Sequence, residues 1–533
     1  MSYKIALKQK IVKKVVKKLL KNVQTGFNLK FTGTFIPIIL VTGTVGKSST
    51  TLMINELFMN AGFQVISGTS ALKNLNSLEG FALTLIKYLI KIQSGENLNE
   101  NELSQKINLE MESLGGILKL KKLLGFYKNL ATFSNISPQQ ISKAKKMIEK
   151  TVIVMEIGFD TMSEFEVFND IFAEIELLVT TSFTFEHSEN FEDNFDTVGF
   201  DKIYNLLPPA LGDSFKNHEI DGRLRNIALE QIKFLNISKN AIIPSSIGKI
   251  ENNFYSNLGL DYFNMINGPV ISRGEKYQLV DTDNNLNFGD KYLLPDTFAK
   301  NGRILLEICK QFNLENGPKK HFELVQKSVS NVNYPHSRFS KFSGLNKTTI
   351  IDSSYNSDPA SLDGFLDTVS GVINHYKSPE ICLENGIAMA PKHILIIGEM
   401  RELGDISTPQ HSLLLEKIKE LENNYPFMIE DVYLLGKEWL KCDQNEIFKS
   451  AGDIQYISLP WKNLKVFLKA GDILKFMKLE ENVPRPHSWI WVKGSQNTIF
   501  SEIIVQSLLE NPGDSEYLCR RGSDWDKKRA PWN

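Results

Sequence analysis

The glycine-rich segment at residues 43–50 constrains the fold of this 533-residue chain more than any other feature. It has the sequence Gly-Thr-Val-Gly-Lys-Ser-Ser-Thr and follows an apolar run at 36–41 that is rich in isoleucine and bounded by proline and glycine. Such a run is typical of a buried strand. A helix is predicted from Lys47 to Asn60, closed by Gly62. Strand, glycine loop and helix in this order form the opening unit of a parallel α/β sheet.

The same loop is suited to binding phosphate. Successive backbone N–H groups cradle phosphate oxygens, and the N-terminus of the helix adds positive potential. We expect Lys47 to contact the β- and γ-phosphates and Ser48 to coordinate Mg²⁺ through its hydroxyl. Two residues separate Gly43 from Gly46, whereas the usual phosphate loop has four. A glycine-rich turn with a chance lysine is the alternative, but the strand and helix on either side favour nucleotide binding.

Regular alternation of strands and helices returns later in the chain. Strands are predicted at 152–157, 177–181, 349–352, 393–397, 432–435 and 489–492, and helices at 359–373, 409–422 and 497–509. Residues 86–145 are expected to be helical, and 213–290 to form a β-rich elaboration. The expected fold class is α/β, with a P-loop central domain built on a mostly parallel sheet and a C-terminal Rossmann-like domain. The expected boundaries are 1–36 for an N-terminal helix and linker, 37–333 for the central domain and 334–533 for the C-terminal domain.

Composition limits the class of protein. Hydrophobic residues make up 42% of the chain and charged residues 23%, which excludes a disordered chain, a collagen and a coiled-coil rod. The four cysteines are Cys309, Cys382, Cys442 and Cys519, and no two of them form a C-x-x-C pair. We therefore expect neither a disulfide framework nor a cysteine zinc site, and a reducing cytoplasm as the location.

The net charge of −1 conceals an asymmetry between the start of the chain and the rest. The first thirty residues contain nine lysines and no acidic residue, so the remaining 503 carry a net charge of −10. Residues 4–21 have apolar side chains at helical spacing and predict a basic amphipathic helix. This helix either lies on an anionic membrane surface, at the inner face of the membrane, or packs on the protein body. It lacks the long apolar run of a transmembrane helix and the features of a signal peptide.

Several segments resemble one family when they are taken together. The phosphate loop has the form used by the Mur ligases and their relatives, the folylpolyglutamate synthases. The later segments, in one-letter code, are N-L-N-S-L-E-G at 74–80, V-M-E-I-G at 154–158, V-T-T at 179–181 with E-H at 186–187, S-R at 337–338, D-S-S-Y-N-S-D-P-A-S at 352–361, G-E-M-R-E-L-G at 398–404 with His411 beyond, and V-K-G-S at 492–495. They cover most of residues 37–510 and most resemble the branch that joins D-alanyl-D-alanine to UDP-N-acetylmuramoyl-tripeptide.

The resemblance implies roles for individual residues. ATP is expected on Gly43, Thr44, Gly46, Lys47, Ser48, Ser49, Asn301, Arg338 and Asp352, with adenine at Asn301 and ribose at Asp352. Mg²⁺ is expected on Ser48, Glu156, His187 and Lys202, the lysine being carbamylated. A histidine is an unusual ligand for this hard cation, so the assignment of His187 as a ligand rests on the resemblance. Substrate is expected at Asn74, Asn76, Tyr355, Asn356, Lys493 and Ser495, although Asn356 is equally suited to a turn. The catalytic set is Lys47, His187, Lys202 and Arg338.

The sequence also departs from the branch that it most resembles. The phosphate loop begins at residue 43, which leaves no room before it for the usual domain that binds the UDP-sugar. Val45 stands where asparagine is usual in the loop, and Gln496 stands where arginine is usual after Lys-Gly-Ser. We therefore expect a change in donor or acceptor recognition.

The implied activity is an ATP-dependent carboxylate–amine ligase that forms an acyl phosphate in cell-wall peptide assembly. One alternative is a ligase or amidating enzyme that acts on a lipid-linked precursor at the membrane. Another is a non-catalytic ATP-binding scaffold. Folate polyglutamylation is less favoured, because the segments at 352–361 and 492–495 resemble the cell-wall branch. The expected partners are ATP, a carboxylate-bearing peptide and an amine, with no nucleic acid, and the chain is expected to be a monomer.

Overall fold

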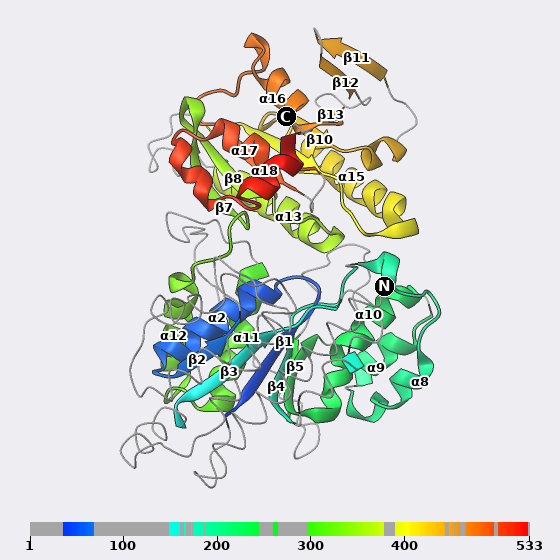
Figure 1. The fold of residues 1–533 in the computed structure, drawn as a ribbon, viewed down its shortest axis with the longest axis vertical. Helices are drawn as coiled ribbons and strands as arrows, with labels where there is room; N and C mark the ends of the chain where they lie inside the picture. Colours follow the sequence, from blue (N-terminus) through cyan, green and yellow to red (C-terminus); the bar gives the residue numbers. More distant parts are fainter. Residues whose placement is uncertain are drawn as a thin grey trace.

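The chain folds into two α/β domains in a computed structural model, one above the other in Figure 1. The structure describes residues 36–68, 149–159, 165–166, 172, 174–185, 187–207, 209–218, 220–244, 260–264, 297–377, 390–442, 447–451, 454–458, 464–494 and 499–530. The expected fold class, a parallel P-loop sheet followed by a Rossmann-like domain, is confirmed. The amphipathic N-terminal helix and the helices expected at 86–145 lie outside these ranges.

The first domain is built on a six-stranded sheet with the order β2-β3-β1-β4-β5-β6. The strands are β1 (Ile38–Thr42), β2 (Gln64–Ser67), β3 (Thr151–Glu156), β4 (Ile175–Thr180), β5 (Ser238–Pro244) and β6 (Leu260–Asn264). The first five pair in parallel, and β6 is an antiparallel edge. Every residue of β1 and β3 is buried, as expected for parallel strands covered on both faces.

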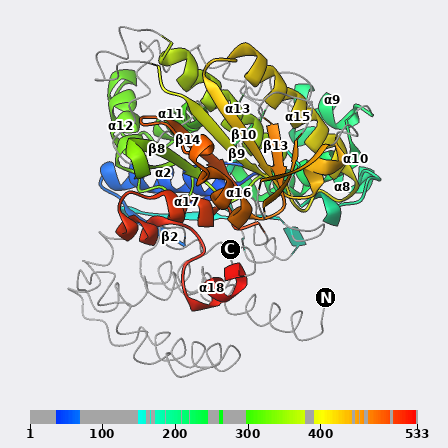
Figure 2. The same ribbon diagram turned by 90° about the horizontal axis from the view of Figure 1, so that it is seen from above.

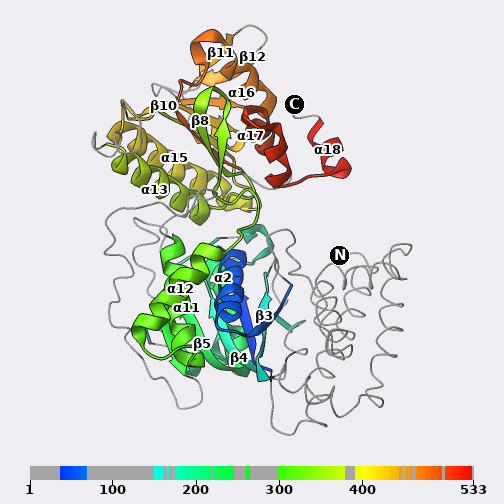
Figure 3. The same cartoon turned by 90° about the vertical axis from the view of Figure 1, so that its left-hand side faces the viewer.

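Helices cover both faces of this sheet. On one face lie α2 (Lys47–Asn60), α11 (Thr297–Phe312) and α12 (Pro318–Asn331), which Figure 3 shows side by side. Their apolar side chains form one cluster with Ile39 and Val41 of β1. On the other face, α9 (Pro209–Lys216) and α10 (Gly222–Ile232) pack in a cluster with Ile38 and Leu40. The predicted bounds of α2 are confirmed at both ends.

The prediction of a β-rich elaboration at 213–290 is wrong for its first part. Residues 213–216 belong to α9, and α10 follows, with Leu224, Ile227 and Ala228 buried at helical spacing. The Asp221 carboxylate caps α10 by accepting a hydrogen bond of 2.8 Å from Arg223 N. The two strands in this region, β5 and β6, extend the main sheet instead of forming a separate unit.

The second domain is built on an eight-stranded sheet with the order β11-β12-β13-β10-β9-β14-β8-β7. The strands are β7 (Ser340–Gly344), β8 (Thr348–Ser353), β9 (His393–Gly398), β10 (Ile429–Leu435), β11 (Ile447–Ala451), β12 (Ile454–Ser458), β13 (Leu464–Phe467) and β14 (Trp489–Lys493). The strands β13, β10, β9, β14 and β8 run in parallel, with antiparallel strands at both edges. All four strands predicted for this domain are confirmed.

The helices of the second domain flank its sheet (Figures 1 and 2). They are α13 (Pro359–His375), α15 (Ser407–Asn424), α16 (Ala470–Met477), α17 (Glu502–Leu508) and α18 (Ser523–Arg529). The predicted helices at 359–373 and 409–422 correspond to α13 and α15, whereas the helix predicted at 497–509 begins at Glu502. Within the described part of the chain, none of the helices combines the length and apolar character needed to cross a bilayer.

The two sheets present their carboxyl edges to each other. The loop that follows β4 contacts the loop that follows β9: Ser188 Oγ donates to the carbonyl of Leu403 at 3.2 Å, and Glu189 N to that of Glu402 at 3.4 Å. Ligands of open α/β sheets bind outside the carboxyl ends of the strands. The space between the domains is therefore the place to look for a site.

Candidate nucleotide and metal site between the domains

The phosphate loop leaves the carboxyl end of the central strand β1 and enters α2. Gly46, with a φ of +89°, is the N-cap residue of α2, and no side chain in the described part of the chain caps the helix. The first helical hydrogen bond runs from Thr50 N to Gly46 O at 2.9 Å. The N–H groups of Lys47, Ser48 and Ser49 therefore precede the helical ladder, an arrangement that is suited to binding an anion.

Residues 181–184, directly after β4, hold the phosphate loop in shape. Ser182 Oγ accepts from Val45 N at 2.8 Å, and Thr181 Oγ1 donates to Val45 O at 2.6 Å. The hydroxyls of Thr44 and Thr184 lie 2.6 Å apart. Thr44 is thus turned away from a ligand and into the protein, where it anchors the loop. Sequence reasoning missed Ser182 and Thr184, and the run of hydroxyl side chains after a buried strand was the available signal.

Ser48 and Glu156, two of the residues expected to bind Mg²⁺, lie together in the structure. The Ser48 hydroxyl donates to Glu156 Oε1 at 2.9 Å, and Glu156 is buried at the end of β3, next to β1 in the sheet. A hydroxyl and a carboxylate oxygen are the donors that Mg²⁺ prefers, and this ion usually completes its shell with water and substrate phosphates. No group of three or more His, Cys, Asp or Glu gathers into a metal cage within the described ranges. The pair therefore suits an ion shared with a nucleotide.

Lys47, expected to contact the β- and γ-phosphates, folds back onto the phosphate loop. Its Nζ donates to the carbonyl of Thr44 at 2.7 Å, and its Cε would lie 3.7 Å from a Cβ added at Gly158. The side chain therefore folds over the loop, beside the turn that follows β3. Asn301, on α11, approaches the loop from the other side, since its amide lies 3.9 Å from the position of a Cβ at Gly46. Asn301 thus lies beside the phosphate loop, and its role in nucleotide binding, with the contact to adenine, stays a prediction.

His187 stands at the boundary between the domains. Its backbone is left-handed, with φ +53°, and its Nδ1 pairs with the Glu402 carboxylate of the second domain. The hydrogen bond from His187 holds the pKa of Glu402 below its usual value. Lys202, expected to be carbamylated beside the same metal, is exposed at the C-terminal end of α8 (Thr197–Asp201). A metal role for Lys202 stays a prediction.

Arg338 lies in the segment that joins the two domains. Its guanidinium carbon lies 4.6 Å from the centre of the Tyr355 ring, a cation–π distance. The Arg338 Nε is buried and has no hydrogen-bond partner among the described residues. A buried donor without a partner is costly, so this atom suits an anionic ligand such as a phosphate or a carboxylate.

Asp352, expected to contact ribose, is fully enclosed by protein. The residue has no exposed surface: its Oδ2 accepts from Ser337 Oγ at 2.6 Å and its Oδ1 from Ser354 N at 2.9 Å. Burial raises the pKa of this carboxyl above its usual value, against the opposing effect of these hydrogen bonds. Asp352 thus ties the interdomain segment to the end of β8, and its contact with ribose stays a prediction.

Lys493 ends β14 on the same sheet edge as β8. Its Nζ donates to the backbone carbonyl of Asn356, and burial lowers its pKa to about 8. The Asn356 side chain accepts from Ser357 N at 2.8 Å, and Asp358 with Ser361 forms a capping box at the start of α13. The Asn356 side chain therefore bonds to the neighbouring backbone, and both its substrate role and its turn role stay predictions. Asn74, Asn76 and Ser495 lie outside the described residues.

The C-terminal tail adds residues that sequence reasoning missed. Arg520 Nη1 donates to the carbonyl of Ser354 at 3.2 Å and to Glu502 Oε2 at 3.1 Å, and Arg520 also contacts the carbonyl of Tyr355. Cys519 N donates to Ser337 Oγ at 3.0 Å. The tail therefore braces the segment that carries Tyr355. No motif marked it, because its partners lie far away in the sequence.

Comparison with known proteins gives matches in structure alone. No family model matches the sequence, and neither does any curated protein. Among solved structures, the chain is similar to MurF from Acinetobacter baumannii, at 12% identity and a TM-score of 0.48, covering 94% of this chain and 80% of that chain. It is similar to MurF ligase from Thermotoga maritima in complex with ADP, at 13% identity and a TM-score of 0.41, covering 92% and 82%.

A third similar structure is the bifunctional folylpolyglutamate synthase/dihydrofolate synthase from Yersinia pestis, complexed with AMPPNP and Mn ion. It has 11% identity and a TM-score of 0.41, covering 93% of this chain and 92% of that chain. At these identities and scores the likeness carries no argument about activity. The function proposed next rests on the residues of this chain.

Proposed function

We propose that this chain is an ATP-dependent ligase that joins a carboxylate to an amine through an acyl phosphate. One observation carries the proposal. The phosphate loop with its Ser48–Glu156 pair lies on one sheet edge, and Arg338 and Lys493 lie at the end of the second sheet that faces it. Nucleotide binding on one domain and anion binding on the other suit a reaction between ATP and a second anionic substrate.

The chemistry proceeds in two balanced steps. A carboxylate oxygen of the substrate attacks the γ-phosphorus of ATP, the bond to the bridging oxygen breaks, and ADP leaves. The nitrogen of a neutral amine then attacks the acyl carbon, and phosphate departs as the amide forms and the nitrogen loses a proton. Positioning supplies much of the rate in such transfers, because little covalent chemistry falls to the protein.

Charge compensation is the main task of the side chains. Two unit negative charges 4 Å apart repel by about 4 kcal/mol at the effective dielectric of a protein surface. Lys47 and the N-terminus of α2 offset the charge of the triphosphate, and Arg338 offsets that of the incoming carboxylate. A bound Mg²⁺, held by Ser48 and Glu156 in our proposal, would supply Lewis-acid polarisation of the phosphoryl oxygens.

We propose that the substrates belong to cell-wall peptide assembly. The support is the run of sequence segments from 154–158 to 492–495 that resemble the D-alanyl-D-alanine-adding branch. A lipid-linked acceptor is the main alternative, because nine lysines in the first thirty residues suit an anionic membrane surface. A scaffold without catalysis is the third candidate.

The deciding experiment measures ATP consumption and identifies products by mass spectrometry. UDP-linked muramyl peptides, lipid-linked muropeptides and a folate with glutamate are each supplied, the muropeptides with D-alanyl-D-alanine. A new amide with one muramyl acceptor supports the proposal and names the substrate form. Product with folate alone, or ATP binding without acceptor-dependent turnover, would contradict it.

Three variants test the phosphate-loop and membrane assignments. Lys47→Ala is expected to abolish turnover, while Lys475→Ala, at an exposed lysine of α16, should leave it unchanged. Full activity of Lys47→Ala would remove the phosphate-loop assignment. Deletion of residues 2–24 is expected to weaken binding to anionic liposomes while turnover of a soluble substrate persists; unchanged liposome binding would contradict a membrane role.

A further inference from the structure

The C-terminal tail closes over the segment that joins the two domains. Cys519 N donates to Ser337 Oγ at 3.0 Å, and the same hydroxyl donates to Asp352 Oδ2 at 2.6 Å. The carbonyl of Ser337 accepts from Tyr355 N at 3.3 Å. Ser337 has no exposed surface, and it is tied at once to the tail, to the end of β8 and to the turn that follows β8.

Arg338 lies between two strained residues of this joining segment. Ser337 and Phe339 both have left-handed backbones, with a φ of +58° in each. Non-glycine residues in this region are strained, and they persist only where the surrounding structure holds them. The contacts around the segment therefore decide where the Arg338 side chain points, because relaxation of either neighbour would redirect it.

Two cations hold three successive carbonyls of the turn after β8. Arg520 donates to the carbonyls of Ser354 and Tyr355. Lys493 donates to the carbonyl of Asn356. The Arg520 side chain is 6% exposed, so its hydrogen bonds are sheltered from water. Its planar guanidinium presents several donors in one fixed geometry, and it therefore fixes the backbone on both sides of the Tyr355 Cα.

The Tyr355 ring lies between the two arginines. Its centre is 4.6 Å from the guanidinium carbon of Arg338 and 5.9 Å from that of Arg520. Among the described residues, the buried Nε of Arg338 has no hydrogen-bond partner. The ring is therefore a main support of the Arg338 guanidinium, and the position of the ring depends on the backbone that Arg520 holds.

The charge of Arg338 acts on Lys493, the residue that ends the neighbouring strand. Burial lowers the pKa of Lys493 to about 8, and the positive charge of Arg338 lowers it as well, against the opposing effect of Asp358. The two cations are therefore close enough to interact. Like charges repel, so a pair of cations with one unpaired buried donor suits an anionic ligand.

We propose that Arg520 is a positioning residue for Arg338. By holding the Ser354 and Tyr355 carbonyls, Arg520 fixes the Tyr355 ring, and the ring directs the Arg338 guanidinium toward the anionic substrate. The proposal rests on the proposed function, in which Arg338 offsets the charge of the incoming carboxylate. The C-terminal tail is then a working part of the site, although no sequence motif marks it.

The test measures how inorganic phosphate stabilises the full chain when ADP and Mg²⁺ are saturating. Phosphate is the anion that the proposed reaction releases, and the melting temperature against its concentration, at constant ionic strength, gives an apparent affinity. Arg338→Ala defines the phosphate binding that depends on this arginine. For that binding, Arg520→Lys is expected to weaken the affinity about tenfold, the lower end of what a lost hydrogen bond to a charged group costs.

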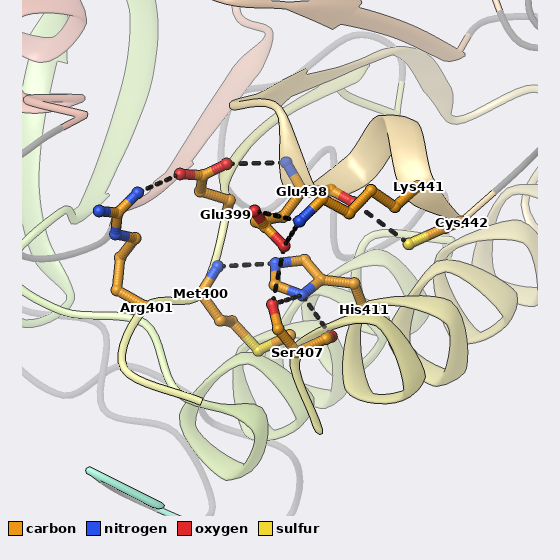
Figure 4. Close-up of polar contacts among 8 residues, drawn as sticks. All are labelled: Glu399, Met400, Arg401, Ser407, His411, Glu438, Lys441 and Cys442. Carbon is orange, nitrogen blue, oxygen red and sulfur yellow. Dashed lines mark hydrogen bonds and ion pairs between the residues drawn. The ribbon is translucent and has the colours of Figure 1, made fainter. Parts of the chain in front are cut away.

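Arg520→Lys separates positioning from folding. Lysine keeps a positive charge opposite the buried Glu502 carboxylate, which lies 3.1 Å from Arg520 Nη1, but it lacks the planar group that holds two carbonyls. Figure 4 shows the matched control, Arg401, whose Nη1 donates to the buried Glu399 at 2.7 Å. Arg401→Lys makes the same change at an arginine that pairs with a buried glutamate, and it leaves the contacts of Tyr355 intact.

A loss with Arg520→Lys but not with Arg401→Lys supports the proposal. Further support is an unchanged residual affinity when Arg520→Lys is added to Arg338→Ala, because a residue that acts through Arg338 has no effect without it. Equal affinities of wild type and Arg520→Lys, or equal losses in the two lysine variants, would overturn the proposal. A tenfold loss from Arg520→Lys in the Arg338→Ala background would overturn it too.

A second variant interrupts the same chain of contacts at an exposed side chain. The Tyr355 ring is 38% exposed, so Tyr355→Ala should fold, and it should weaken phosphate binding as much as Arg520→Lys does. Wild-type affinity in Tyr355→Ala would contradict the proposal. If wild type binds no phosphate through Arg338, the inference fails, yet the proposed ligase activity still stands or falls by its product.

Discussion

Replacing Gly43 with alanine tests whether the phosphate loop is built as described. Gly43 has a φ of +128°, a conformation that side-chain-bearing residues rarely adopt. An added Cβ would lie 2.1 Å from Thr181 Oγ1 and 2.8 Å from Thr181 N. The hydroxyl can rotate away, but the backbone nitrogen belongs to the segment that holds the loop, so the loop itself must shift.

The loss of stability expected for Gly43→Ala is the sum of two contributions. A residue held in a sparsely populated backbone region costs about 1–3 kcal/mol, and an added methyl in a packed site about 1–3 kcal/mol. We therefore expect Gly43→Ala to destabilise the first domain by roughly 2–6 kcal/mol and to abolish ATP binding. Gly62→Ala, at the end of the same helix, isolates the backbone contribution: φ is +82° there, and a Cβ would meet nothing within 4 Å.

Scanning calorimetry with and without ATP measures both effects. Gly62→Ala should lower the unfolding temperature of the first domain by the strain contribution alone. ATP binding should still raise that temperature in this variant. Gly43→Ala should lower the unfolding temperature further and lose the rise with ATP. Addition of Thr181→Ala should restore little, because the clash with the backbone nitrogen remains. If Gly43→Ala behaves like Gly62→Ala, the described packing of the loop is refuted.

Three further perturbations have outcomes that the structure determines. Burial lowers the pKa of Lys493 to about 8, so between pH 8 and about 10.4 the unfolded chain binds a proton that the folded chain does not, and stability rises with pH in that window. Lys493→Met should therefore raise the melting temperature most below pH 8, and a gain that grows with pH would contradict this. Arg520→Met leaves the buried Glu502 unpaired and should cost about 3–5 kcal/mol in chemical unfolding; a cost below that of Lys475→Ala would refute the pairing. Ser182→Ala removes the acceptor of Val45 N and should cost about 1–3 kcal/mol together with weaker ATP binding in calorimetry, whereas unchanged ATP affinity would show that the loop does not need this brace.

The core of both sheets could be predicted because its signals are local. Apolar runs such as those of β1 and β3 are buried on both faces, and Gly43 with Lys47 marks where the first strand becomes a helix. The β-rich prediction was wrong at 213–232, and the cause of this error is equally local. Short polar stretches and turn residues obscured the spacing of Leu224, Ile227 and Ala228, which fits a helix better than a strand.

The roles of individual residues were harder to predict than the positions of helices and strands, because a sequence motif does not determine which way a side chain points. Asp352 was expected to contact ribose, and in the structure its carboxylate accepts from Ser337 and Ser354. Asn356 stands in the same segment, 352–361, and its side-chain oxygen accepts from the neighbouring Ser357 N. Only the packing of β8 against the interdomain segment and the C-terminal tail decides these orientations.

The sequence by itself determined the strand–loop–helix unit, the parallel strands of the second domain and the candidates Lys47, Ser48 and Glu156. These depend on hydrophobic spacing and on glycine, which act within a few residues. The tertiary structure alone decided that Ser182 holds the phosphate loop, that Arg520 braces Tyr355, and that Glu402 meets His187. Each of these contacts joins positions far apart in the chain, and only the folding of two sheets edge to edge brings the partners within hydrogen-bonding distance.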